Sequence, residues 1–277
     1  MTNSLSRTIP FVFVVALLGC SSEEVTQQVS AEKRFAVAMR LFQEEEYTEA
    51  IEEFKIITLQ SQGSRLADDA QFYMGECRYM RGEFILAAYE YDVLLRTMPT
   101  SEFVSRCRFR KALCYYNLSP ESYRDQEYTK KAIDEFQAFL EYNPTDSLAS
   151  SAEVRINELN TKLAKKDFEN GIIYMKMEYY KAAALYFDEV LEKYHDSPYA
   201  EPSLLKKAEA LYSRKRYEEA GKEVERFLDK YPASILKPDV ERLRDDTRLR
   251  LQELQNKEPK PPSEKRTAQD TTRSNGP

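Results

Sequence analysis

The chain has 277 residues and a formal net charge of −6, with a pI near 5.3 and acidic and basic residues interspersed along its length. It has no basic stripe of the kind that neutralises phosphates, so we expect no nucleic-acid partner. Only 7 glycines and one histidine, His195, are present, which leaves no Gly-rich phosphate loop and no partners for a nucleophilic triad or a metal centre. We therefore expect neither an enzyme, a cofactor nor a metal site.

The first segment of the chain has the features of a targeting signal rather than of a folded element. One basic residue, Arg7, precedes an apolar run from Ile9 to Gly19. That run is shorter than the roughly 20 apolar residues needed to span a bilayer. It ends in Leu-Leu-Gly followed by Cys20, which resembles the lipobox where bacterial lipoprotein precursors are cut before the cysteine and acylated on it.

We therefore predict a signal peptide over residues 1–19, lipid attachment at Cys20 and a tether over residues 20–30. An ordinary secretory signal with an incidental cysteine is the alternative. Several acyl chains would give a durable anchor. Ser21 and Ser22 follow the cysteine where an inner-membrane retention signal would have Asp, so we expect a lipid anchor in the outer membrane, on its periplasmic face.

Three cysteines remain once Cys20 is assigned to lipid. Cys107 and Cys114 lie seven positions apart on one expected helix, which separates them by about 10 Å along its axis. A disulfide requires Cα atoms within about 7 Å. A disulfide between Cys77 and Cys107 is the alternative in an oxidising periplasm. The preferred interpretation is three buried thiols that act as small apolar residues.

An internal repeat determines the expected fold, which is all-α: a tetratricopeptide-repeat superhelix of five helix-pair repeats. In four units a small residue on the first helix is followed twelve positions later by a small residue on the second. An aromatic residue stands four positions after the second small residue, except in the fifth unit, which has Val224. The five pairs are Ala38/Ala50, Gly75/Ala87, Ala112/Ala132, Gly171/Ala183 and Ala208/Ala220.

Two insertions interrupt the regular spacing. The interval in the third unit is twenty instead of twelve, so its helix-helix turn has eight added residues. Ala132 and Ala183 are 51 positions apart instead of 37, so about fourteen residues are extra, and a helix over about 148–166 would absorb them. We predict repeats 1–3 over residues 31–147, and a linking helix with repeats 4–5 over residues 148–256, with a hinge between these halves.

The last segment, residues 257–277, is polar and rich in proline and has no apolar periodicity. This composition is typical of a disordered tail.

The third unit carries a more particular sequence than the repeat template requires. The run from Phe109 to Pro120, followed by Asp125-Gln126, Thr129 and Phe136 to Leu140, resembles the signature segment of the BamD family. This family comprises β-barrel assembly lipoproteins of Gram-negative bacteria, and the resemblance extends over essentially all of residues 25 to 240. His195 departs from it, because the family usually has Pro in that turn, and a solvated turn residue is the preferred interpretation.

Family geometry places helix-A positions 2, 5, 9, 12 and 13 of each unit on the concave wall of the superhelix. In repeats 1–3 this wall would be aromatic and apolar, which suits a peptide-binding groove. Packing of many of these aromatic rings inside the helix array is the alternative. The predicted groove residues are Phe35, Met39, Phe42, Phe72, Tyr79, Met80, Arg106, Phe109 and Tyr116.

The resemblance implies a non-enzymatic role in the β-barrel assembly (Bam) complex. The expected partners are the periplasmic domain of BamA, other Bam lipoproteins, and the aromatic-ended C-terminal segments of unfolded outer-membrane proteins. Arg106 would receive the terminal carboxylate of such a segment. The alternative function is a tetratricopeptide lipoprotein scaffold that recruits peptidoglycan or other cell-envelope enzymes.

Overall fold

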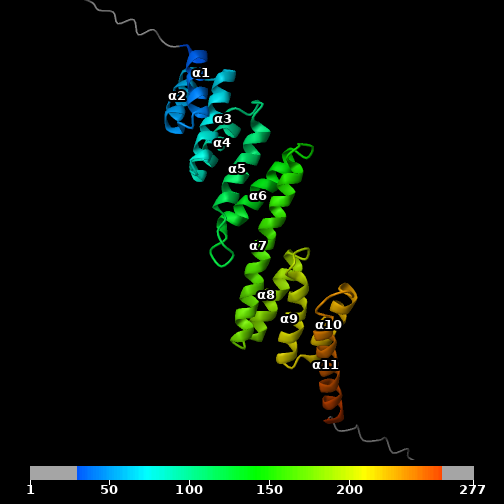
Figure 1. The fold of residues 1–277 in the computed structure, drawn as a ribbon. Coiled ribbons are helices and arrows are strands. Elements are labelled where there is room, and N and C mark those ends of the chain that lie inside the picture. Colours follow the sequence, from blue (N-terminus) through cyan, green and yellow to red (C-terminus); the bar gives the residue numbers. More distant parts are fainter. Residues whose placement is uncertain (1–29, 258–277) are drawn as a thin grey trace, which may run out of the picture.

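The computed structural model describes residues 30–257, which form α-helices joined by short turns and stacked into an elongated array (Figure 1). The predicted signal peptide, Cys20, nearly all of the tether and the tail beyond Lys257 lie outside the described residues. None of the described helices is both long and apolar enough to cross a membrane. The helices are α1 (Ala31–Gln43), α2 (Tyr47–Gln60), α3 (Arg65–Met80), α4 (Phe84–Thr97), α5 (Val104–Leu118), α6 (Glu127–Tyr142), α7 (Ala149–Lys176), α8 (Tyr180–Lys193), α9 (Ala200–Ser213), α10 (Tyr217–Lys230) and α11 (Lys237–Lys257).

Helices α1 to α10 form the five predicted pairs, which confirms the all-α tetratricopeptide fold. Every member of the five small-residue pairs is buried, as is each residue four positions after the second member. Two consecutive helices therefore approach closely at the small residues, and the large side chain fills the space between them. These side chains are Phe54, Tyr91, Phe136, Phe187 and Val224.

The closest helix approaches explain the two glycines in the template. A Cβ atom added to Gly75 would lie 2.5 Å from Cε1 of Tyr91, and one added to Gly171 would lie 2.5 Å from Cε1 of Phe187. Real Cβ atoms do not approach other atoms so closely, and neither ring has room to move because both rings are buried. Glycine at these two positions thus brings the helices together.

The matching alanines on the second helices provide a test of this packing. Leucine in place of the fully buried Ala183 or Ala220 is expected to cost about 1–3 kcal/mol, because the added atoms have no space between the helices. Thermal unfolding followed by circular dichroism measures this loss. Lys181→Leu, at an exposed position of the same helix as Ala183, is the matched control. Equal melting temperatures for Ala183→Leu and Lys181→Leu would contradict the packing described here.

The turn between the two helices of a pair is alike in four of the five units. One residue in each adopts a left-handed backbone conformation, with φ between 60° and 73°. Glycine occupies this position only in the second unit, as Gly82. The other three units have Glu45, Glu178 and Lys215 there. The third unit replaces this three-residue turn by an eight-residue loop over residues 119–126, which takes up five of the eight added residues. Longer α5 and α6 take up the other three.

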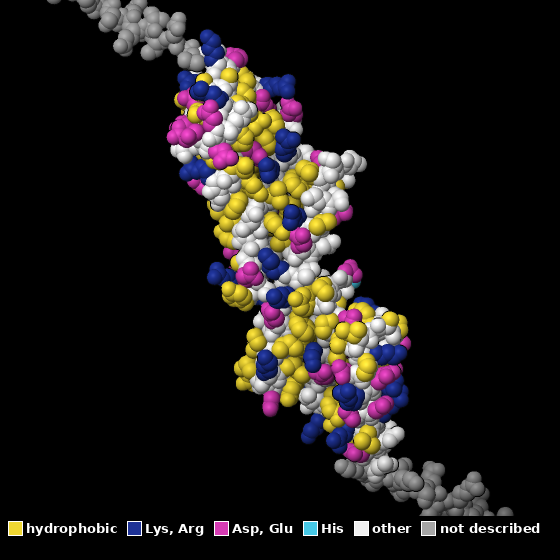
Figure 2. All heavy atoms as spheres, viewed as in Figure 1, with side chains coloured by type: hydrophobic (Ala, Val, Ile, Leu, Met, Phe, Trp, Pro, Cys, Tyr) yellow, Lys and Arg dark blue, Asp and Glu magenta, His cyan; other side chains and the backbone are white. Residues whose placement is uncertain are grey.

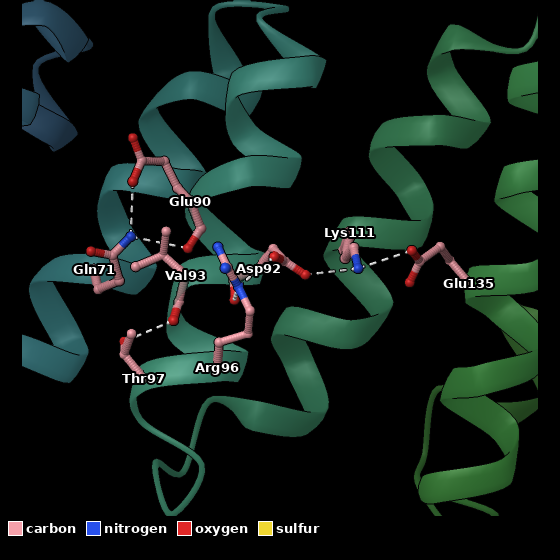
Figure 3. A network of polar contacts seen from close by, with 8 residues as sticks. All are labelled: Gln71, Glu90, Asp92, Val93, Arg96, Thr97, Lys111 and Glu135. Carbon is pink, nitrogen blue, oxygen red and sulfur yellow. Dashed lines mark hydrogen bonds and ion pairs between the residues drawn. The ribbon is translucent and has the colours of Figure 1, made fainter.

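Buried lysines tie successive second helices together. The Nζ atom of Lys111 on α5 lies 3.0 Å from Asp92 on α4 and 2.9 Å from Glu135 on α6 (Figure 3). Lys207 on α9 forms the same bridge between Asp188 on α8 and Glu223 on α10. Each lysine immediately precedes the small residue of its helix, whereas the other three units have Val37, Met74 and Asn170 at this position, so the bridge is confined to the third and fifth units. Burial opposes the charge on Lys111, but its two carboxylate partners outweigh burial and raise its pKa.

Helix α7 contains both the extra residues and the first helix of the fourth unit. Its N-terminal part contributes Ala152, Leu159 and Leu163 to the core formed with α3 to α6. Its C-terminal part, from Phe168 onward, packs with α8 and α9 in a separate core. The predicted linking helix is thus present. Because α7 is continuous through the predicted hinge, a change of angle between the halves requires bending of α7 or movement of the elements packed on it.

The three described cysteines are free thiols and fully buried, which confirms the preferred interpretation. Burial raises the pKa of Cys77 and of Cys114 to about 12, so both thiols stay protonated at neutral pH. No disulfide joins Cys77 to Cys107.

Candidate peptide-binding face

The predicted groove residues all lie on α1, α3 and α5, the first helices of repeats 1–3. We call the surface that these helices present the first-helix face. Apolar side chains reach the molecular surface in both halves of the molecule (Figure 2). The contribution of each predicted residue to the first-helix face depends on how much of its side chain is exposed.

In repeat one the predicted residues are half-buried and form part of an aromatic cluster. The ring of Phe35 lies 5.7 Å from that of Phe54 and 6.2 Å from that of Tyr73, and the ring of Phe42 lies 5.5 Å from that of Tyr73. Met39 packs against the same cluster. These edge-on contacts stabilise the packing of α1 against α2 and α3. Each of these side chains still has a partly exposed surface.

Two predicted groove residues are core residues instead. Phe72 is only 2% exposed and stacks on Phe103 with ring centroids 4.3 Å apart. Phe109 is also buried, and its ring lies between those of Phe136 and Phe139. The expectation that these two rings face a ligand is therefore corrected. Phe72 packs against the turn that precedes the next helix pair, and Phe109 packs against the second helix of its own pair.

Tyr79 and Met80 end α3 and are more accessible. Met80 is 56% exposed. The Tyr79 ring lies under the Arg110 guanidinium, 4.8 Å from its centroid, and the Tyr79 hydroxyl accepts a hydrogen bond from the Asn117 amide at 2.9 Å. These contacts hold the tyrosine ring in place without covering it completely.

A buried polar cluster lies next to Tyr79. The Glu76 carboxylate accepts a hydrogen bond from the Tyr91 hydroxyl at 2.6 Å and forms an ion pair with Arg110. Burial and the nearby Glu76 charge raise the pKa of Tyr91, which keeps its hydroxyl a donor. Burial opposes the charged form of Arg110, but the pairing with Glu76 outweighs it and raises the pKa of Arg110. The positive charge of Arg110 is thus balanced by the Glu76 carboxylate within the protein.

Tyr116 is held by helix α7. Its hydroxyl donates to Glu158 at 2.7 Å and accepts from Arg155 at 2.8 Å, while the Arg155 guanidinium lies 4.6 Å from the ring centroid. Burial and the hydrogen bond to Glu158 raise the pKa of Tyr116. The half-buried ring is therefore fixed in orientation, and part of it remains exposed.

Arg106 differs from Arg110 and Arg155 in having no partner for its charge. It is exposed on α5, and its guanidinium lies 5.5 Å from the centroid of the Phe72 ring. Among the described residues, no carboxylate forms an ion pair with it, whereas Arg110 and Arg155 each have one. A free guanidinium on an apolar base is suited to bind a carboxylate by charge-assisted hydrogen bonds.

The first-helix face thus combines exposed Met80, half-buried Tyr79 and Tyr116, and the unpaired charge of Arg106. The sequence analysis missed the contacts that organise it, which come from Glu76, Arg110, Asn117, Arg155 and Glu158. Their partners are 34 to 42 positions apart, except for the Arg155–Glu158 pair on one helix turn, so no short motif indicates them.

Within residues 30–257, no group of three or more histidine, cysteine, aspartate or glutamate side chains is arranged to hold a metal ion. The side chain of His195 is 59% exposed in the turn between α8 and α9, next to Asp196. This exposure fits the solvated turn residue that the sequence indicates.

The chain matches known proteins over most of its length. It is 23% identical to the outer membrane protein assembly factor BamD of Rickettsia prowazekii, over 83% of this chain and 93% of that protein. It is 24% identical to BamD of Caulobacter vibrioides, over 88% and 82% of the two chains. The TPR2AB domain in the pHSP90 complex of yeast Sti1 is similar in structure, with 16% identity, a TM-score of 0.41, and coverage of 82% of this chain and 86% of that one.

A family match is consistent with these relatives. Residues 27–210 match the YfiO family, described as outer membrane lipoproteins. The matched range contains all of α1 to α8, most of α9, the enlarged third turn and every predicted groove residue. The resemblance to BamD is thereby confirmed. The chain belongs to the YfiO family of outer membrane lipoproteins.

Proposed function

We propose that this protein is the BamD-type component of an outer-membrane protein assembly complex. In this proposal a lipid on Cys20 tethers it to the periplasmic face of the outer membrane. Its N-terminal half binds the C-terminal segments of unfolded outer-membrane proteins, and its C-terminal half docks the periplasmic domain of BamA. The names of the relatives support the assembly role. The lipid tether and the two binding activities go beyond those names and are our own proposal.

The substrate-binding part of the proposal rests on the composition of the first-helix face. A segment that ends in an aromatic residue offers one ring and one carboxylate. Arg106, in the first turn of α5, supplies an exposed guanidinium without a partner among the described carboxylates, which suits the terminal carboxylate. Met80 at the end of α3, and Tyr116 about 15 Å beyond Arg106 along α5, supply apolar surface for side chains earlier in the same segment. Binding energy at such surfaces is concentrated in a few anchors, and water is excluded by the surrounding contacts.

An apolar surface in the C-terminal half supports the docking of BamA. Four large apolar side chains near the turn between α7 and α8 are each more than half exposed. Two of them, Tyr179 and Leu185, line one hollow together with Tyr174 and Tyr180, and exposed apolar side chains that gather in this way are typical of protein interfaces. The surface consists of Ile173, Met177, Tyr179 and Leu185.

Leu185→Asp tests this docking surface. Leu185 is 59% exposed on α8, so a charge there should leave the fold intact while it disrupts an apolar interface. We expect the wild type, carrying an affinity tag, to co-purify BamA from detergent-solubilised outer membranes, and the variant to lose most of it. Leu254→Asp is the control, because Leu254 is similarly exposed but lies on α11.

Three outcomes of the same experiment would contradict the proposal. Retention of BamA by Leu185→Asp would exclude this surface. Equal loss by both variants would indicate a nonspecific effect of added charge. Recovery of peptidoglycan hydrolases or synthases with the wild type, in place of BamA, would instead favour a scaffold for cell-envelope enzymes.

A further inference from the structure

The two insertions in the repeat template contact each other. The insertion in the third unit enlarges its turn to a loop over residues 119–126, which we call the strap. The extra residues between the third and fourth units extend α7 at its N-terminal end. Figure 1 shows the strap between α5 and α6 lying beside the middle of α7.

The strap is built as an ordered element rather than an open loop. The side-chain amide of Gln126 donates hydrogen bonds to the carbonyl oxygens of Glu121, Ser122 and Arg124, at 2.8, 3.4 and 3.1 Å. The Thr129 hydroxyl donates to the carbonyl oxygen of the Gln126 side chain at 2.7 Å. Ser122, Gln126 and Thr129 are all buried, and buried polar groups that are satisfied in this way fix a single loop conformation.

Polar contacts fasten the strap along one side of α7. The Lys162 ammonium donates to the Ser119 hydroxyl at 2.8 Å and to the Ser119 carbonyl oxygen at 3.3 Å. Lys166, one turn further on, donates to the carbonyl oxygen of Arg124 at 2.5 Å. The Ser122 hydroxyl donates to Glu169 at 3.3 Å. Residues 162, 166 and 169 are spaced by four and three, so they form one stripe on the helix.

This stripe lies where the stacking of the repeats is interrupted. The core of the N-terminal half includes α7 as far as Leu163, and a separate core begins at Phe168. Between these two points α6 and α8 are separated by a cleft of about 830 Å³, lined by residues of the strap, α6, α7 and α8. Apart from Tyr194, which packs against the first core from the end of α8, apolar contact between the halves is sparse here.

We infer that the strap is a clasp that sets the angle between the N-terminal and C-terminal halves. A bend of α7 at residues 163–168 would open or close the cleft. Lys162, on the N-terminal side of this bend, holds the strap on α7, whereas the contacts of the strap with Lys166 and Glu169 lie within and beyond the bend. Because Asp125 and Gln126 of the strap line the cleft, a bend would move residues 166–169 relative to the strap and break these two contacts. Under the proposed function, the clasp fixes the position of the substrate-binding half relative to the half that docks BamA.

The distance between the two halves tests the clasp without relying on the proposed function. Spin labels are placed on Lys55→Cys in α2 and Lys222→Cys in α10, both exposed, and their separation is measured by pulsed electron paramagnetic resonance. The three native thiols within residues 30–257 are buried, and the raised pKa values of Cys77 and Cys114 further disfavour their labelling. Cys20, which lies outside the described residues, is replaced by alanine so that it takes no label. The unmodified strap is expected to give one narrow distribution of distances.

Lys162→Met and Lys166→Met together remove the two ammonium groups but keep side chains of similar length. The distance distribution of this double variant is expected to broaden or shift, while its helical circular dichroism stays that of the wild type. Lys176→Met with Lys181→Met is the matched control, because both lysines are exposed and neither contacts the strap. This control should reproduce the wild-type distribution.

A second variant removes contacts between the strap and α7 by changing residues of the strap. Ser119→Ala with Ser122→Ala removes the hydroxyls that bind Lys162 and Glu169, and should broaden the distribution in the same way. A folded Lys162→Met, Lys166→Met protein with the wild-type centre and width would overturn the inference. So would an equal change in the Lys176→Met, Lys181→Met control. Failure to recover BamA with the wild type would contradict the proposed function alone and leave these distances unaffected.

Discussion

Replacing Glu76 by alanine is expected to lower the melting temperature by about 6–12 °C, which corresponds to a loss of about 3 kcal/mol in a domain of this size. Glu76 is buried and receives both the Arg110 charge and the Tyr91 hydroxyl. Its removal leaves a guanidinium without its carboxylate and a buried donor without an acceptor. The loss lies at the lower end of the range for buried pairs, because 27% of the Arg110 side chain remains exposed.

Two further variants separate the charge of Glu76 from its size. Glu76→Gln keeps an acceptor for Tyr91 but cannot neutralise Arg110, so its melting temperature should fall between those of the wild type and Glu76→Ala. Glu102→Ala removes the partner of Arg65 from a largely exposed ion pair, which should cost no more than about 1 kcal/mol. Equal melting temperatures for Glu76→Ala and Glu102→Ala would show that the buried cluster does not stabilise the fold.

The fold was predictable because each tetratricopeptide unit repeats the same local requirement. A small residue is needed wherever two helix backbones meet, and a large one is needed beside it. Gly75 with Tyr91, and Gly171 with Phe187, meet this requirement within 16 positions of the sequence. Local periodicity therefore specifies the helix pairs and their phase without any knowledge of distant contacts.

The elements outside the template were less predictable. The sequence analysis did not identify α11 as a separate helix, although its residues other than Lys257 fall within the predicted C-terminal half. This helix is largely polar, and its apolar positions do not follow the repeat pattern, although Val240 packs in the core with α9 and α10. The size of the insertion could be read from the spacing of Ala112 and Ala132, but not how it divides between the strap and longer α5 and α6. Its contacts with Lys162 and Lys166 bridge about 42 positions and have no local signal.

The exposure of individual groove residues was the least predictable feature. Position within the repeat places a residue on a helix face, but it does not say whether a neighbouring ring covers that residue. Phe72 is covered by Phe103 from the turn before α5, which lies outside the template. Arg106 and Arg110 occupy one helix four positions apart, yet only Arg110 finds a carboxylate, because Glu76 projects from the preceding unit. Tertiary packing decides between these outcomes.

The remaining prediction concerns the proposed binding of an aromatic-ended segment. A synthetic C-terminal peptide of an outer-membrane protein, with a free terminal carboxylate, is expected to bind Arg106→Gln about 10- to 150-fold more weakly than the wild type. This corresponds to about 1.5–3 kcal/mol for a hydrogen bond to a charged group. Isothermal titration calorimetry measures the affinities. Arg96→Gln, which alters an exposed arginine on the second helix α4, should bind as the wild type does.

The peptide with an amidated C-terminus completes a double-mutant cycle. If Arg106 contacts the carboxylate, amidation should weaken binding to the wild type and have little further effect on Arg106→Gln, because both changes remove the same contact. Tyr116 lies about 15 Å beyond Arg106 along α5, so its partner would be a side chain earlier in the peptide than the terminal residue. Tyr116→Ala and a peptide in which that side chain is replaced by alanine form a second cycle, with the same expectation. Phe72→Ala is not informative in this assay, since truncation of a buried phenylalanine costs about 3–5 kcal/mol of stability. Additive losses in both cycles would place the substrate elsewhere on the protein, and Arg106 would then have no part in recognising a chain terminus.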